Sequence, residues 1–144
     1  MDSKRGVLVI VTGEFYTRCG LTVADSVVRF NSGLPITIFT DQTVVDPVFM
    51  SVGLIQNPPL RSKVDYRNKS PFEQILNLDS DIRVVDKLDA LFRLLKRFEL
   101  AAACVRYRFS LKNQKIWGQF QIGILYFMQR IRSWIDSEKK FGDV

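Results

Sequence analysis

Residues 6–12 read Gly-Val-Leu-Val-Ile-Val-Thr, and this apolar run decides the fold that we expect. Its side chains are continuously apolar, whereas a strand with one face in water alternates apolar and polar residues. A strand that is buried on both faces is typical of a parallel sheet covered by helices. We therefore expect an α/β fold, namely a three-layer, Rossmann-like domain with a mainly parallel central sheet.

The sequence after this run completes a β-α-β unit. Apolar residues recur at near-helical spacing from Leu21 to Phe30, and Asn-Ser-Gly at residues 31–33 supplies a stop. A second apolar strand is predicted over residues 36–40 and ends at Asp41. The crossover between these two parallel strands is expected to be right-handed.

The rest of the chain is expected to add strands, one helix and a tail. We predict a weaker strand over 52–55, strands over 74–79, 100–105 and 120–127, a loop over 106–119 and a helix from residue 131. Asp86 or Asp89 is expected to cap a helix between the strands at 74–79 and 100–105. The apolar face of that helix would hold Leu88, Leu91, Leu94, Leu95 and Phe98.

Charge and residue usage exclude several kinds of chemistry. The chain has 21 Lys and Arg against 15 Asp and Glu, a net charge of +6, and no histidine. A Ser-His-Asp or Cys-His relay, an imidazole zinc site and a histidine base are therefore excluded. The basic residues are spread along the chain without an RNP, KH or helix-turn-helix pattern, which disfavours nucleic acid as a partner. A small molecule that carries phosphate fits this charge.

Length and hydropathy indicate one compact unit. A chain of 144 residues buries enough surface for one core, so we expect a single domain over residues 1–144. No apolar run approaches the roughly 20 residues of a membrane helix, and the first residues do not resemble a secretory leader. We expect a cytoplasmic protein without a transmembrane segment.

Two carboxylates leave the strand that is predicted over residues 74–79. Asp79 and Asp81 flank Ser80 at its carboxyl end, which is where ligands bind in open α/β sheets. Two hard oxygen donors at this spacing suit Mg²⁺ or Mn²⁺ shared with a diphosphate. Acids after a strand also cap turns, and both interpretations stay open at this point.

The segment before these carboxylates carries further motifs. Lys63, Ser-Pro-Phe at residues 70–72, an apolar strand and Leu-Asp-Ser-Asp at 78–81 follow one another. This run resembles one in the nucleotide-diphospho-sugar transferases, and residues 9–16, 35–41, 91–103 and 120–124 resemble other segments of that superfamily, in the same order. The resemblance covers nearly the whole chain and implies the GT-A fold of glycosyltransferases.

The resemblance also implies a nucleotide-sugar site, with Mn²⁺ or Mg²⁺ as cofactor and a UDP- or GDP-sugar as donor. The implied base and ribose pocket is lined by Val11, Thr12 and Tyr16, with Asp41 facing the base and Lys63 meeting the diphosphate. The implied metal and ribose ligands are Asp79 and Asp81, and Ser80, Gln121 and Gly123 complete the site. The implied activity is transfer of the sugar to a hydroxyl of a sugar or glycoconjugate acceptor.

Three of these residues have a plain structural interpretation as well. Tyr16 could be a loop aromatic packed on the core, and Lys63 could belong to a solvated basic segment. Asp41 could be a residue of a strand-end turn. Their roles at a ligand are therefore expectations that rest on the resemblance.

Two departures from the family pattern bear on activity. Gln121 stands where the family strand carries Asn, and a misplacement of about 1 Å at such a site can cost about a hundredfold in rate. The sequence ends at Val144, soon after the strand that opens the acceptor-binding half, so we expect a curtailed acceptor site. The basic residues Arg130, Arg132, Lys139 and Lys140 are expected to belong to a solvated amphipathic helix, and the alternative is an acceptor or peripheral membrane contact.

Two other functions stay open. One is a non-catalytic remnant that binds a nucleotide sugar. The other is a haloacid-dehalogenase-like phosphohydrolase, which also uses Asp-x-Asp after a strand, with one aspartate as nucleophile. That class normally places the motif at its first strand, whereas here it follows a complete β-α-β unit.

Overall fold

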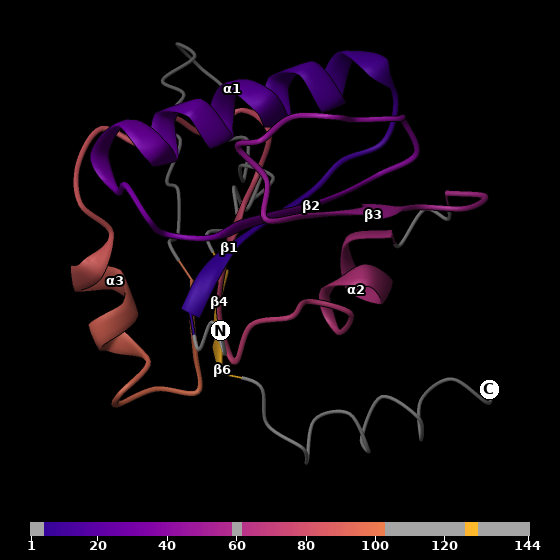
Figure 1. Ribbon diagram of the computed structural model, residues 1–144. Coiled ribbons are helices and arrows are strands. Elements are labelled where there is room, and N and C mark those ends of the chain that lie inside the picture. Colours follow the sequence, from indigo (N-terminus) through magenta and orange to yellow (C-terminus); the bar gives the residue numbers. More distant parts are fainter. Residues whose placement is uncertain (1–4, 59–61, 103–125, 130–144) are drawn as a thin grey trace, which may run out of the picture.

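The described part of the chain forms one mixed sheet with helices around it (Figure 1). The computed structural model describes residues 5–58, 62–102 and 126–129. Its strands are β1 (Arg5–Ile10), β2 (Ile36–Thr40), β3 (Ser51–Leu54), β4 (Gln74–Leu78), β5 (Leu100–Ala102) and β6 (Tyr126–Gln129). Its helices are α1 (Glu14–Phe30), α2 (Ser62–Arg67) and α3 (Asp89–Leu94).

The strands lie in the order β3-β2-β1-β4-β6-β5. β1 pairs in parallel with β2 and β4, and β2 pairs in parallel with β3. β6 is antiparallel to both of its neighbours, β4 and β5. The predicted α/β fold with a mainly parallel sheet is therefore confirmed, and β6 is the strand that runs against the others.

The register brings three strand ends to one level. Val9 of β1 lies opposite Ile38 of β2 and Leu78 of β4. Each of these strands ends within two residues of this row. The residues that follow β1, β2 and β4 therefore gather at a single edge of the sheet, which we call the carboxyl edge.

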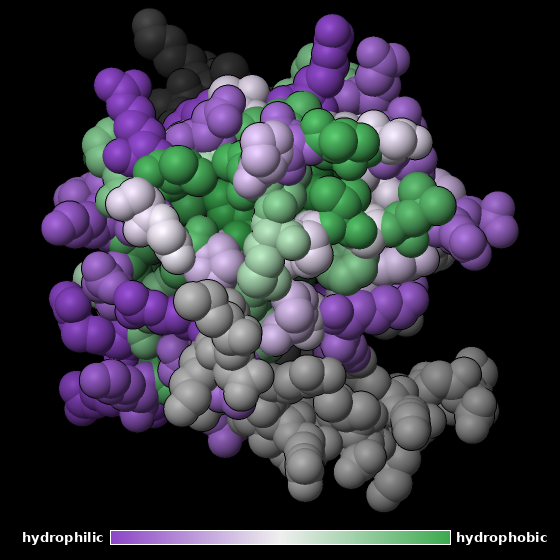
Figure 2. Space-filling view, in the orientation of Figure 1, coloured by the Kyte–Doolittle hydropathy of each residue, from purple (hydrophilic) through white to green (hydrophobic). Residues whose placement is uncertain are grey.

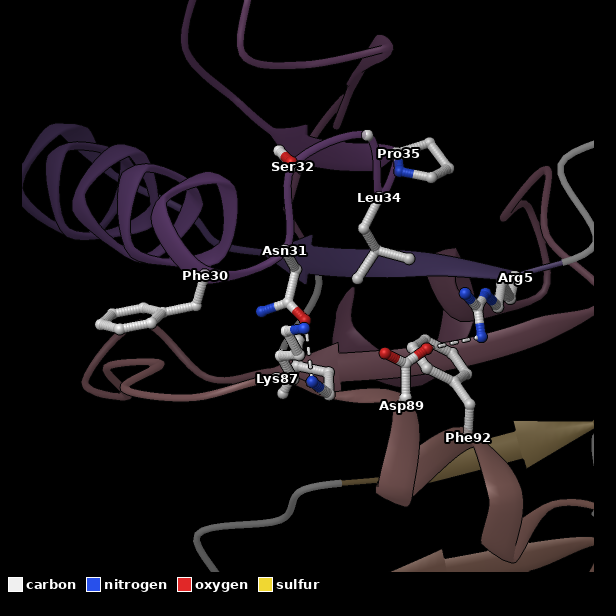
Figure 3. Close-up of a pocket in the computed structure, with 11 residues that line it drawn as sticks. Arg5, Phe30, Asn31, Ser32, Leu34, Pro35, Lys87, Asp89 and Phe92 are labelled. Atoms are coloured by element: carbon white, nitrogen blue, oxygen red, sulfur yellow. Dashed lines mark hydrogen bonds and ion pairs between the residues drawn. The ribbon is translucent and has the colours of Figure 1, made fainter.

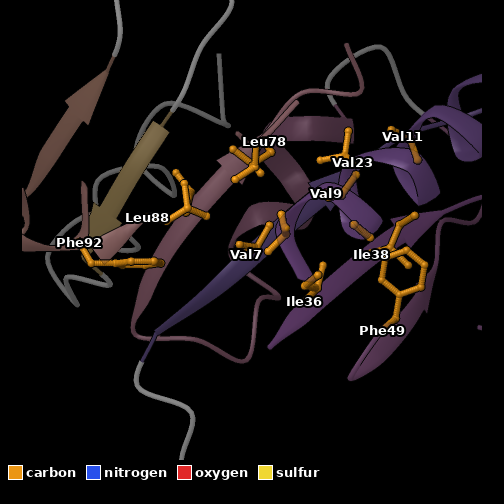
Figure 4. Close-up of a cluster of buried hydrophobic side chains, with 14 of the residues drawn as sticks. Val7, Val9, Val11, Val23, Ile36, Ile38, Phe49, Leu78, Leu88 and Phe92 are labelled. Atoms are coloured by element: carbon orange, nitrogen blue, oxygen red, sulfur yellow. The ribbon is translucent and has the colours of Figure 1, made fainter. Parts of the chain in front are cut away.

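Apolar side chains cover both faces of the parallel strands, because alternate residues of a strand point to opposite sides. Val7, Val9 and Val11 belong to a core that includes residues of α1 and Phe92 of α3 (Figure 4). On the other face Leu8 and Ile10 pack with Phe39, Ile55, Phe72 and Ile75, and Tyr66 of α2 lies against that cluster. Both faces are covered, as the continuous apolar run predicts.

Helix α1 lies close to the sheet along its whole buried side. Its buried residues are Thr17, Gly20, Val23, Ala24 and Val27. A Cβ added to Gly20 would lie 3.3 Å from side-chain atoms of Ile38 and Val9, so glycine permits this close approach. The predicted stop is confirmed, since the N–H of Asn31 donates to the carbonyl of Val27 and Gly33 has a positive φ of 84°.

Several boundary predictions are wrong. Helix α3 contains six residues rather than extending to Phe98, and neither predicted aspartate caps it, because residue 88 precedes it without a side-chain cap bond. Among the predicted face residues, Leu88 and Leu95 are buried, whereas Leu94 and Phe98 are 39% and 54% exposed. Phe92 takes the inner position instead. Leu94 is exposed within α3 and Leu95 just beyond it is buried, so the buried face is the one that carries Leu88, Phe92 and Leu95.

Two further segments differ from expectation. Residues 62–67 form α2, where only a basic segment was predicted. Leu100 in β5 is 47% exposed, because β5 is an edge strand rather than a buried one. Residues 103–105 and 120–125 of two predicted strands, the loop over 106–119 and the helix from residue 131 lie outside the described residues.

The edge of the described sheet that is formed by strand β3 is apolar. Within the described part of the chain β3 pairs with β2 alone, and Val52 and Leu54 are 41% and 59% exposed, with Val45 and Met50 also exposed. Figure 2 shows apolar side chains gathered on the face that carries β2 and β3, below α1. In the described part of the chain, no helix has the length and apolar character needed to cross a membrane.

Candidate functional site

The carboxyl edge collects the residues that the sequence singled out. Thr12 follows β1, Asp41 follows β2, and Asp79 follows β4, and all three are half-buried. Ser80 is also half-buried, and Asp81 is exposed. Gln121 and Gly123 lie outside the described residues. The structure therefore brings together three of the predicted segments at one edge.

The turn from β1 to α1 is held by Asp41. The backbone N–H of Gly13 donates to Asp41 Oδ1 at 2.7 Å, and Gln42 Nε2 donates to the same oxygen at 3.0 Å. Gly13 has φ 84° and ψ 153°, a combination that is essentially restricted to glycine. This bond joins positions 28 residues apart, so the ends of β1 and β2 are fixed to each other.

The same two donors explain the acidity of this carboxyl. The Gly13 N–H, and after it the Gln42 side chain, hold the pKa of Asp41 below its usual range, while burial acts in the opposite direction. Hydrogen bonds to the charged form favour ionisation. Asp41 is therefore a carboxylate that braces the turn, and its predicted role toward a nucleotide base stays a prediction.

Hydrogen bonds of two threonine hydroxyl groups support the turn between β1 and α1. Thr17 Oγ1 donates to the carbonyl of Gly13 at 2.9 Å and lies 2.7 Å from Thr40 Oγ1, which accepts the N–H of Gln42 at 3.2 Å. A hydroxyl has one proton to donate. Since Thr17 uses its proton on Gly13, Thr40 donates to Thr17. Both threonines are buried, which makes this network expensive to leave unsatisfied.

The residues that were predicted to line the base and ribose pocket differ in their exposure. Val11 is buried in the core, and its N–H donates to the carbonyl of Phe39 at 3.0 Å, so only its backbone can reach a ligand at the edge. Tyr16 is 55% exposed in the first turn of α1 and makes an edge contact with Phe15, with ring centroids 5.3 Å apart. Tyr16 is thus a surface aromatic rather than a core residue.

Lys63 and Asp79 meet at this edge. Lys63 Nζ and Asp79 Oδ1 form an ion pair between α2 and the end of β4. The Lys63 side chain is 58% exposed and the Asp79 side chain 25% exposed. The predicted lysine and the first aspartate of the Asp-x-Asp motif are therefore neighbours, although 16 residues separate them.

The elements that carry this pair are anchored. Ser62 and Arg67 at the two ends of α2 are buried, and the Tyr66 ring lies 5.5 Å from the Phe39 ring. Between α2 and β4, Phe72 is fully buried over Gly6. The packing of α2, and that of Phe72 between α2 and β4, thus positions the backbone of Lys63 relative to the sheet.

The two aspartates belong to one turn. The N–H of Ile82 donates to the Asp79 carbonyl at 3.2 Å, which closes a turn that has the carboxylates at its first and third positions. Their oxygens suit Mg²⁺ or Mn²⁺, which proteins commonly hold by one or two carboxylates together with substrate phosphates. No group of three metal-ligating side chains occurs in the described ranges. Two carboxylates supply only part of a metal's shell, so a bound ion would need further oxygen ligands from elsewhere.

Helix α1 holds the segment that follows this turn. Ser26 Oγ accepts the N–H of Val84 at 3.1 Å, and Asn31 Oδ1 accepts the N–H of Leu88 at 2.8 Å. Asn31 Nδ2 also donates to the carbonyl of Asp86 at 3.2 Å. Helix α1 therefore connects the Gly13 turn at the carboxyl edge with residues 84–88, which lead toward the hollow at the amino ends of the strands.

A separate hollow lies at the amino ends of the strands (Figure 3). It has a volume of about 330 Å³, and the ion pair between Arg5 and Asp89, 3.0 Å long, spans part of it. Both partners are half exposed, and such pairs contribute little. None of the predicted site residues lines this hollow, so we place the candidate site at the carboxyl edge on chemical grounds.

Two solved structures are similar to this chain, both of the glycosyltransferase GlyE in Streptococcus pneumoniae TIGR4. The first has a TM-score of 0.62 and 20% identity and covers 94% of this chain. The second, the apo form, has a TM-score of 0.53 and 21% identity and covers 99% of this chain. The chain has the fold of a glycosyltransferase.

The glycosyltransferase fold is matched only in part. This chain spans 36% and 40% of the lengths of the two GlyE chains. No protein-family model matches the sequence, and no curated protein matches it. The similarity to GlyE therefore shows the fold of this chain alone.

Sequence reasoning missed the residues that support the site. Thr17 and Ser26 lie on α1 and Asn31 directly follows it, and all three bond to segments elsewhere in the fold. Thr17 lies one helical turn before the predicted apolar positions, and Ser26 lies among them. Polar residues within the apolar face of α1 could have indicated where this helix hydrogen-bonds to backbone groups. The bond between Gly13 and Asp41 carried no local signal.

Proposed function

We propose that the carboxyl edge binds the nucleoside diphosphate part of a nucleotide-sugar donor, and that the chain is the donor-binding part of a glycosyltransferase of the GT-A type. The observation that carries the proposal is the contact between Lys63 and Asp79. The resemblance implies that Lys63 meets the diphosphate and that Asp79 holds the metal and ribose, and the two side chains form an ion pair in a chain whose fold is similar to that of a glycosyltransferase.

Charge is the chemical basis of the proposed site. When a nucleotide sugar loses its sugar, negative charge develops on the departing diphosphate, and positioned cations stabilise that charge. The Lys63 ammonium on α2 supplies one positive charge at the edge. Asp79 and Asp81 are the residues that would hold Mn²⁺ or Mg²⁺, and the bound ion would neutralise further charge on the leaving group.

The β1–α1 turn is the proposed site of the base and ribose. The rigid Gly13–Asp41 contact fixes the start of α1, where Tyr16 offers an exposed ring on which a base can stack. Thr12 is half-buried beside it and can offer hydroxyl and backbone groups to the ribose. Phosphates would then lie between this turn and the Lys63–Asp79 pair, along the edge of the sheet.

Calorimetric titration tests the proposal. The full chain is titrated with UDP-, GDP- and ADP-sugars, each with and without Mn²⁺, to identify the base and the metal dependence. The Asp79→Asn and Asp81→Asn double variant is expected to lose Mn²⁺-dependent binding. Asp25→Asn is the matched control, because Asp25 is an exposed carboxylate on α1. Binding that survives in the double variant contradicts the proposal.

A second pair of variants tests the base pocket. Tyr16→Ala is expected to weaken donor binding by about 1–3 kcal/mol, the range measured for bases stacked on aromatic side chains. Phe30→Ala is its control, since Phe30 is an exposed aromatic at the other end of the same helix. Equal binding by the two variants would exclude Tyr16 from the site.

Binding and transfer are separate outcomes. Incubation with a labelled nucleotide sugar, Mn²⁺ and a panel of sugar acceptors distinguishes glycosylated product from free sugar. Product formation supports a transferase, and release of free sugar indicates that water competes for the donor. Donor binding without turnover supports the non-catalytic alternative.

A further inference from the structure

We propose that Lys63 occupies, in the ligand-free protein, the position beside Asp79 that a divalent cation takes when the donor binds, so that Lys63 couples metal binding to diphosphate binding. The inference rests on the proposed function and adds a regulation of that site. Its starting observation is that the Lys63 ammonium contacts Asp79 Oδ1, one of the oxygens assigned to the metal.

The contact creates direct competition. A divalent cation that binds Asp79 through this oxygen must displace the ammonium, because two cations that contact the same carboxylate oxygen repel each other. The incoming cation must also bind close to the displaced Lys63 ammonium, which repels it and stays near because Lys63 belongs to α2. Mn²⁺ or Mg²⁺ alone should therefore bind weakly, for a reason additional to its incomplete set of oxygen ligands.

A diphosphate removes the competition. Its oxygens offer Lys63 a new anionic partner and at the same time complete the shell of the metal. The lysine can turn from Asp79 to the phosphate, because its side chain is 58% exposed and its four-carbon stem is flexible. The metal and the diphosphate thus each favour the binding of the other, and this linkage is reciprocal.

The surroundings make the exchange local. Helix α2 is anchored by buried Ser62 and by the contact of Tyr66 with Phe39, so the lysine backbone stays in place. Asp79 follows a strand whose residues Leu76 and Leu78 are buried. Only the Lys63 side chain has to move, which distinguishes this exchange from the closure of a loop.

The test compares Mn²⁺ binding with and without UDP in wild type and in Lys63→Met, by calorimetry. Lys63→Met removes the charge and keeps an unbranched side chain. The variant is expected to bind Mn²⁺ alone about three- to tenfold more tightly, from the loss of an exposed ion pair and of like-charge repulsion. The factor by which UDP tightens Mn²⁺ binding should fall by a similar amount.

Lys69→Met is the matched control, because it removes the same charge just beyond α2, where Lys69 lies over the Tyr66 ring. It is expected to leave the affinity for Mn²⁺ within about twofold of wild type. Lys63→Gln should behave as Lys63→Met does, which guards against an effect of the methionine itself. Unfolding curves verify that each variant is folded.

The outcomes separate this inference from the proposed function. If wild type binds UDP in a Mn²⁺-dependent manner but the Lys63 variants bind Mn²⁺ alone no more tightly, the competition is refuted and the donor site stands. If wild type binds none of UDP, GDP and ADP in the presence of Mn²⁺, both are refuted. Tighter Mn²⁺ binding in both Lys63 variants, with the control unchanged, supports the competition.

Discussion

Replacement of Gly13 by alanine should destabilise the protein and damage its proposed donor site together. Gly13 has φ 84° and ψ 153°, and forcing another residue into this region costs about 1–3 kcal/mol. No atom outside the adjacent residues lies within 4 Å of the added Cβ, so the cost is conformational and not a clash. For 144 residues, this loss lowers Tm by about 3–10 °C.

Gly33→Ala provides the control. Gly33 also has φ 84°, and its added Cβ likewise meets nothing within 4 Å, but it lines the hollow at the amino ends of the strands. Both variants should lose stability in thermal and urea unfolding. Only Gly13→Ala should also weaken binding of UDP with Mn²⁺, because Gly13 joins the turn to Asp41.

Two results would refute this reasoning. If Gly13→Ala unfolds at the same temperature and urea concentration as wild type, the turn does not require the left-handed conformation. If the variant loses stability but binds UDP as well as Gly33→Ala does, the β1–α1 turn is not part of the donor site.

Three further changes test the packing and electrostatics of the same region. Gly6→Ala would bring a Cβ to 2.4 Å from ring atoms of fully buried Phe72; we expect a loss of about 1–3 kcal/mol in urea unfolding, and an unchanged midpoint would contradict the packing. Thr17→Val removes the partner of buried Thr40 at 2.7 Å, which should cost about 1–3 kcal/mol, whereas Thr17→Ser should retain most of the stability. The lowered pKa of Asp41 means that its ionised form stabilises the fold above the unfolded value near 3.9. That contribution is lost as the pH falls through the folded pKa, so the stability advantage of wild type over Asp41→Asn should vanish at low pH; a pH-independent difference would argue against the bond to Gly13.

Strand positions were predictable where burial leaves a clear pattern. Residues 36–40 form β2 as expected, and the runs at 7–12 and 74–79 differ from β1 and β4 by one or two residues. These strands are covered on both faces, so their sequences are continuously apolar. β5 was predicted to be buried in the same way, but a short apolar run does not distinguish an edge strand from a central one.

Contacts between segments that are far apart in the sequence could not be predicted from the sequence. Asp86 and Asp89 have the right chemistry for a helix cap, yet Asn31, which directly follows α1, accepts the Leu88 N–H, 57 residues away. Asp89 instead pairs with Arg5. Helix α2 was missed because six residues are too few to display a helical period. In the candidate site, the lysine and Asp-x-Asp segments were predicted from a resemblance, whereas the brace between Gly13 and Asp41 required the fold.

The central claim is that a nucleoside diphosphate and its metal bind at the carboxyl edge of the sheet. The most direct test is an NMR titration of the ¹⁵N-labelled chain with UDP and Mn²⁺, because the paramagnetic ion broadens the amide signals nearest to it. We predict that broadening centres on residues 79–82 and extends to Gly13, while amides near Asp89, at the amino ends of the strands, keep their intensity. Broadening centred on Asp89, or none at residues 79–82 when Mn²⁺ is present with UDP, GDP and ADP in turn, would contradict the claim.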